Sequence, residues 1–204
     1  FKAAQKKNFV NNVKPGKYIL KKGFSNLEII NSLKFNNIPV KVTFNNVQRI
    51  EDLASKISNL IEPDSLSLMK SFLGTDFLLN NQLTSESVFA VFIPNTYDFY
   101  WNSSPDVFRD RMLKYFNSFW NTERLRKAKL LNLSPVEVSV LASIVQRETP
   151  KVDERPTISG VYYNRILKNM KLQFSKQVSN QINAQIQRLH IKDVLNSLLR
   201  LNLL

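Results

Sequence analysis

The chain has 204 residues, 43% of them hydrophobic and 14 of them phenylalanine, which is enough for one good core or for a small module beside a larger domain. It has no cysteine and a single histidine, His190, which argues against disulfides, thiolate or histidine-based metal sites and a Ser/His/Asp triad. The net charge of +13 suits nucleic acid, an anionic membrane surface or an acidic polymer. Any catalysis must therefore use carboxylates, amides and hydroxyls.

Turn and capping signals organise residues 14–34. Residues 14–16, Lys-Pro-Gly, predict a turn, and residues 18–20 predict a short strand. Ser25 and Glu28 have the spacing of a capping box that opens a helix. The apolar face of that helix would be formed by Leu27, Ile30 and Leu33.

The same order, a strand and then a helix, returns over residues 40–61. Residues 40–44, Val-Lys-Val-Thr-Phe, alternate apolar and polar side chains and predict a half-buried strand. Residues 50–61 have helical spacing, with an inward face formed by Leu53, Ile57, Leu60 and Ile61. The N-terminal part is therefore predicted to be built from βα units.

A second strand is predicted further along, over residues 89–93, from its β-branched and aromatic content. It would end at Pro94-Asn95-Thr96-Tyr97 and so deliver polar groups to the rim of a sheet, where functional sites are common. Tyr100 and Trp101 follow, and they would either fill the core or face a ligand.

Residues 105–120 predict a helix that is apolar on one side and basic on the other. The inward residues would be Phe108, Met112, Tyr115, Phe116 and Phe119, and the exposed ones Arg109, Arg111 and Lys114. The basic stretch over residues 121–130 is interpreted as a solvated face or as a surface that attracts a polyanion.

A helix with a strong start follows, because Ser134 can cap it, Pro135 takes its first position and Glu137 completes a capping box. Leu141, Ile144 and Val145 form an apolar stripe, and the next position on that stripe is Glu148. A carboxyl group there needs a partner or a raised pKa. Two readings follow: Glu148 pairs with a cation such as Arg155, or it is a protonated acid able to donate to a leaving oxygen.

The sequence of this region resembles that of the endolytic murein transglycosylases of the YceG-like family. The chain reads LASIVQRET, then ERP, then GVYYNRILKNMKLQ, and the family pattern is LASI-V/I-E/Q-x-E-T, then E-R, then V-F/Y-x-N-R-L-x-x-G-M-x-L-Q. The catalytic acid of that pattern falls on Glu148, and Gln146 stands where many relatives carry a Glu. The family's P-D/N-T-Y/W motif also matches Pro94 to Tyr97.

The resemblance implies a lyase that cleaves the MurNAc–GlcNAc bond within peptidoglycan strands, leaves 1,6-anhydroMurNAc ends and terminates nascent glycan elongation, with no cofactor and no metal. It implies Glu148 as the catalytic residue. The implied substrate-binding residues are Asn95, Thr96, Tyr97, Gln146, Glu154, Asn164 and Gln173. One alternative is a non-catalytic peptidoglycan-binding or scaffold protein of the cell-wall synthesis machinery. The other, on charge alone, is a nucleic-acid-binding protein. Given the match to the family motif, no nucleic-acid partner is expected.

The fold implied is α+β: a LysM-like module over residues 1–44, a helix-rich catalytic domain with a short sheet over 45–173, and a helical tail over 174–204. Such relatives have an N-terminal membrane anchor, absent from this chain, which would place the catalytic part on the periplasmic side of the inner membrane beside cell-wall synthases and divisome proteins. Beyond Gln173 the motifs stop, because the family's Asp-Pro-Thr and Gly-Leu-Pro-Pro-Gly segments are not found.

Overall fold

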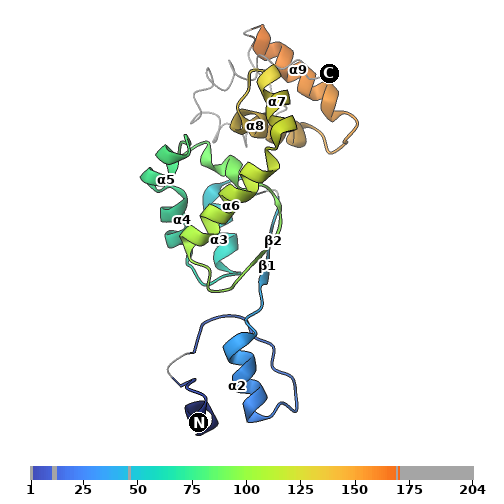
Figure 1. Ribbon diagram of the computed structural model, residues 1–204. Helices are drawn as coiled ribbons and strands as arrows, with labels where there is room; N and C mark the ends of the chain where they lie inside the picture. Colours follow the sequence, from blue (N-terminus) through green and yellow to red (C-terminus); the bar gives the residue numbers. More distant parts are fainter. Residues whose placement is uncertain (1, 11–12, 46, 169, 171–204) are drawn as a thin grey trace. The chain divides into compact units, whose positions relative to one another are not determined.

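The computed structural model describes residues 2–10, 13–45, 47–168 and 170, and its α+β class confirms the prediction. The chain divides into two compact units, one of Phe1–Gly74 with Pro94–Arg111 and one of Thr75–Ile93 with Met112–Leu204. Figure 1 labels their helices and strands along the chain. The finer predictions, a LysM-like module and domain limits at residues 44 and 173, stay predictions.

The first unit begins with the short helix α1 (Lys2–Lys6) and with α2 (Asn26–Phe35). The predicted capping box of α2 is confirmed: the Ser25 N–H donates to Glu28 Oε2 at 2.7 Å, and the Glu28 N–H donates to Ser25 Oγ at 3.3 Å. Of the predicted apolar face, Ile30 is buried, whereas Leu27 is exposed.

The strand predicted over residues 18–20 is wrong. The only pairing of this segment among the described residues is an isolated antiparallel bridge between Lys17 and Ile38. Ile19 and Leu20 are both exposed, so the segment buries no apolar face that would hold it in a sheet. The Tyr18 hydroxyl instead donates to the Lys14 carbonyl, which closes the preceding turn.

The sheet has two antiparallel strands, β1 (Val40–Phe44) and β2 (Asn95–Phe99), with Val42 opposite Tyr97 and Thr43 opposite Thr96. The strand predicted over residues 40–44 is confirmed as β1. The strand predicted over residues 89–93 is wrong, because that segment forms the 3-10 helix η1 (Val88–Val91). An unbroken apolar run does not distinguish a strand from a buried helical turn. The second strand begins at Asn95, where the sequence had predicted that it ended.

The core of the first unit lies between the sheet, the helices α3 (Ile50–Ser58) and α4 (Ser65–Phe72), and residues 105–111 of α6 (Pro105–Phe119). The ring of Phe99 is fully buried, 4.5 Å from the ring of Phe108, and the Arg111 guanidinium lies 4.8 Å above it. The helix predicted over residues 50–61 is confirmed as α3, which ends three residues earlier than predicted.

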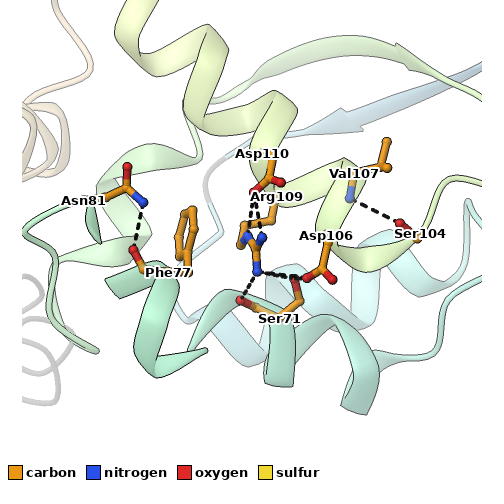
Figure 2. Close-up of polar contacts among 8 residues, drawn as sticks. All are labelled: Ser71, Phe77, Asn81, Ser104, Asp106, Val107, Arg109 and Asp110. Carbon is orange, nitrogen blue, oxygen red and sulfur yellow. Dashed lines mark hydrogen bonds and ion pairs between the residues drawn. The ribbon is translucent and has the colours of Figure 1, made fainter. Parts of the chain in front are cut away.

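Arg109 was predicted to be exposed, and this is wrong. Its guanidinium reaches from α6 to the end of α4, where Nη1 donates to the Ser71 carbonyl at 3.2 Å (Figure 2). The same atom donates to Oδ1 of Asp106, on α6 itself, at 2.8 Å. Asp110 binds the other side of the same guanidinium at 2.7 Å. The predicted inward position of Phe119 is also wrong, because Phe119 is exposed and the neighbouring Trp120 is buried.

The second unit contains α5 (Thr75–Asn80), η1, α7 (Thr122–Leu130), α8 (Pro135–Glu148) and α9 (Arg155–Leu167). Helix α8 packs against η1, α7 and α9. Gln173 and the predicted helices of residues 174–204 lie outside the described residues.

None of the helices in the described part of the chain could by itself span a membrane. Taken together, α7 and α8 satisfy the length and composition of a span, but they meet at a bend of 80°.

Candidate active site at the end of helix α8

Helix α8 carries Glu148 at its last residue. The predicted capping box fixes its start: the Ser134 N–H donates to Glu137 Oε2 at 2.7 Å, and the Glu137 N–H donates to Ser134 Oγ at 3.3 Å. The apolar stripe of α8, Leu141, Ile144 and Val145, is buried as predicted, and Glu148 is half-buried at its end. The helix therefore brings one carboxylate to the edge of an apolar core.

Tyr162 of helix α9 contacts this carboxylate. Its side chain is only 5% exposed, and its hydroxyl is hydrogen-bonded to Glu148. Burial, followed by the hydrogen bond and the negative charge of Glu148, raises the pKa of the Tyr162 hydroxyl well above its ordinary value, and the positive charge of Arg165 acts in the opposite direction. The hydroxyl thus stays protonated at neutral pH and serves as a donor to Glu148.

Tyr162 was not among the predicted site residues. One signal was present in the sequence: Tyr162 lies three residues before Arg165, and this spacing places both side chains on one face of a helix. What the sequence did not show was that this face of α9 meets the end of α8.

The loop between α8 and α9 is closed by Glu154. The Thr149 hydroxyl, which is buried, donates to Glu154 Oε2 at 2.8 Å, and the Lys151 ammonium lies 2.9 Å from Glu154 Oε1. The Lys151 N–H also donates to Thr149 Oγ1 at 3.0 Å. These contacts, first that of Lys151 and then that of Thr149, lower the pKa of Glu154. Glu154 thereby braces the chain directly after Glu148, and its predicted role in substrate binding stays a prediction.

Arg155, the alternative partner of Glu148, begins helix α9. Its Nε atom is buried and has no hydrogen-bond partner in the described part of the structure, so that atom does not neutralise Glu148. The positive charge of Arg165 acts on the Tyr162 hydroxyl that is bonded to Glu148.

The other predicted residues fall into three places. Gln146 on α8 and Asn164 on α9 are exposed. Asn95 and Thr96 are exposed on β2, in the first unit, whereas Tyr97 is buried and stacks on Phe44 with ring centroids 5.6 Å apart. The structure thus brings together Glu148, Tyr162 and Arg165, and the predicted binding residues stay predictions.

The residues gathered around Glu148 suit acid–base chemistry by one carboxylate, because a phenol donor and an arginine charge accompany it. Of the two other acids of the loop, Glu154 is bound by Thr149 and Lys151, and Asp153 is exposed. No group of three or more His, Cys, Asp or Glu residues that could hold a metal ion occurs within the described ranges.

The chain is thus an α+β protein in which a capped helix ends in a carboxylate. These two features define the class of protein to which it belongs. The chain belongs to the YceG-like family, whose model matches residues 1–199. The match confirms the resemblance and extends past Gln173, where the motifs had stopped. Membership is consistent with a murein transglycosylase kind of function. No curated protein and no solved structure matches the chain.

Proposed function

We propose that this protein is a lytic transglycosylase, a carbon–oxygen lyase that cleaves the bond between N-acetylmuramic acid and N-acetylglucosamine within peptidoglycan strands. The observation that carries the proposal is Glu148: it occupies the acid position of the YceG-like pattern, it ends a capped helix, and it accepts a hydrogen bond from the buried Tyr162 hydroxyl.

One carboxylate suffices for this reaction. Hydrolytic glycosidases need two carboxylates because a water molecule or an enzyme nucleophile must be activated. In the proposed lyase Glu148 donates its proton to the glycosidic oxygen as the bond from C1 of the muramyl sugar breaks. The C6 hydroxyl of the same sugar then bonds to C1 and gives its proton to Glu148. The products are a free GlcNAc hydroxyl and a 1,6-anhydro end, and no water is consumed.

Tyr162 would act as a positioning residue. Its hydroxyl holds one side of the Glu148 carboxyl group, so the other oxygen can face the glycosidic bond with its rotation restricted. The loop clasp of Thr149, Lys151 and Glu154 supports the same geometry, because it fixes the backbone that follows Glu148. The neutral amides of Gln146, Asn164 and Gln173 would hold N-acetyl groups.

The proposal includes the place of the reaction. The enzyme would terminate nascent strands on the periplasmic side of the inner membrane, next to cell-wall synthases and divisome proteins. Residues 1–44 would form a LysM-like glycan-binding part. The net charge of +13 supports attraction to the stem-peptide carboxylates of murein.

The test is digestion of purified glycan strands followed by mass spectrometry for anhydro ends. Glu148→Gln keeps the shape of the side chain but removes the transferable proton, so anhydro products should disappear. Glu123→Gln is the matched control, since Glu123 pairs with Lys127 on the exposed surface of α7, and it should retain activity. Anhydro ends formed by Glu148→Gln at the parent rate would contradict the proposal.

The positioning role of Tyr162 has its own control on the same helix. Tyr162→Phe should lower kcat by about tenfold, the equivalent of one lost hydrogen bond to a charged group, with little change in KM. Tyr163→Phe should have no such effect, because Tyr163 is equally buried and burial alone raises its pKa. If both variants behave alike, the effect belongs to packing and not to the contact with Glu148.

Other outcomes would favour the alternatives. Retention on murein without products from the parent protein would indicate a non-catalytic scaffold. Salt-sensitive retention on DNA, with no affinity for murein, would indicate that the charge serves nucleic acid.

A further inference from the structure

The two-stranded sheet has one face that is not covered by the core. Along β2 the side chains of Tyr97 and Phe99 point inward, and those of Thr96 and Asp98 are exposed. Continuing the alternation places Tyr100 with the outward residues. We call this surface the outer sheet face, and it consists of Lys41, Thr43, Thr96, Asp98 and Tyr100, with Trp101 next to it.

Hydrogen-bonding groups run along the outer sheet face. The hydroxyls of Thr43 and Thr96 lie 2.8 Å apart across the two strands. Lys41 and Asp98 are the next register partners, and both are exposed. From Thr96 to Tyr100 the row is about 13 Å long, at the usual rise of a strand. The face therefore offers donors and acceptors over the length of a short oligosaccharide.

Two large aromatic rings stand at the end of this row. Tyr100 is 51% exposed and Trp101 is 36% exposed, so the sequence-based alternative that they fill the core is wrong. Their backbone is fixed, because the Trp101 carbonyl accepts from the Glu62 N–H at 2.8 Å and the Tyr100 carbonyl accepts from the Ser103 N–H at 3.0 Å. Adjacent exposed aromatic residues on an anchored turn indicate a binding surface.

The charges on the face indicate which kind of ligand fits. Lys41 contributes one positive charge and Asp98 one negative charge, so the face has no net charge although the whole chain has +13. A phosphate polymer would require a surplus of cations. A neutral ligand rich in hydroxyl and amide groups matches the threonine pair, the Lys–Asp pair and the aromatic rings.

We propose that the outer sheet face binds N-acetylated glycan strands, with Tyr100 and Trp101 stacked on the apolar faces of pyranose rings and Thr43, Thr96 and Asp98 bonded to their polar edges. The identity of the glycan rests on the proposed function. Tyr97, buried against Phe44, would hold the strand in place and would not itself touch the sugar.

The chain offers a direct reporter, because it has only two tryptophans, Trp101 and Trp120. Trp120 is buried, so Trp120→Phe leaves Trp101 as the sole emitter. The protein would also carry Glu148→Gln to prevent turnover. Titration with N-acetylglucosamine tetramer should give a saturable change in Trp101 emission, and maltotetraose, which lacks N-acetyl groups, should give none.

Variants of the face make the test specific. Tyr100→Ala should weaken binding about tenfold, within the usual worth of one stacked aromatic ring, and Tyr100→Phe should restore it. Phe119→Ala removes another exposed ring, at the end of helix α6, and should leave binding unchanged. Calorimetry on the same proteins gives the affinity independently of fluorescence.

The inference and the proposed function fail separately. If Trp101 emission and Tyr100→Ala affinity do not respond while anhydro ends still form, the outer sheet face is not the binding surface. If binding is seen on this face but the parent protein forms no anhydro ends, the lyase proposal fails and the glycan-binding face remains.

Discussion

Replacing Arg109 by alanine is expected to destabilise the first unit, because this guanidinium joins the end of α4 to α6. Nη1 donates to the Ser71 carbonyl at 3.2 Å and to the Ser71 hydroxyl at 3.3 Å, and Ser71 is buried (Figure 2). The carbonyl belongs to the last turn of α4, where helix carbonyls lack partners within the helix and a cation is favourable.

The magnitude follows from the exposure of each partner. Asp106 and Asp110 are 68% and 60% exposed, so their ion pairs with Arg109 contribute together at most about 1 kcal/mol. The bonds to Ser71 are part-buried and charge-assisted, which adds about 1 to 2 kcal/mol. The expected loss in the free energy of unfolding is therefore about 2 kcal/mol.

Urea unfolding measures this loss, with Trp101 emission in the Trp120→Phe background as a reporter inside the first unit. Arg49→Ala is the control, because its pair with Glu51 is 61% and 49% exposed, and it should change the free energy of unfolding by less than about 0.5 kcal/mol. An Arg109→Ala loss as small as that of Arg49→Ala would refute the reasoning and make the cluster an ordinary solvated one.

Three further predictions concern the local structure. Gly16→Ala should lower the thermal midpoint, because an added Cβ would lie 2.5 Å from the side chain of Asn37, which also accepts from the Lys17 N–H; the same substitution in an Asn37→Ala background should be tolerated. Ser134→Ala should cost about 1 kcal/mol of stability in urea unfolding through loss of the α8 cap, and an unchanged midpoint would contradict it. Glu154 should titrate, by NMR of its carboxyl carbon, below its ordinary pKa of 4.5, and Thr149→Val should raise that midpoint. Because the pKa of Glu154 is lowered in the folded protein, the stability that the loop clasp contributes is present in full above pH 4.5. It is lost as the pH falls through the pKa of the folded state.

Local structure was predictable where it depends only on residues that are close in the sequence. Both capping boxes, at Ser25 and at Ser134, formed as expected, since the partner of each cap lies three residues away. The alternation of residues 40–44 likewise predicted β1, and the stripe on α8 predicted which side of that helix is buried. The sequence alone also shows the position of Glu148 on that stripe and the family pattern around it.

Tertiary packing decided the rest. Residues 89–93 became a helical turn and residues 95–99 a strand, because only pairing with β1 determines which segment enters the sheet. In the same way, Tyr162 meets Glu148 only because α9 packs on α8, and Tyr100 faces solvent only because β2 turns its other side to the core. A single sequence encodes the spacing within each element, but contacts between distant elements depend on how the apolar faces find one another, and no local pattern carries that information.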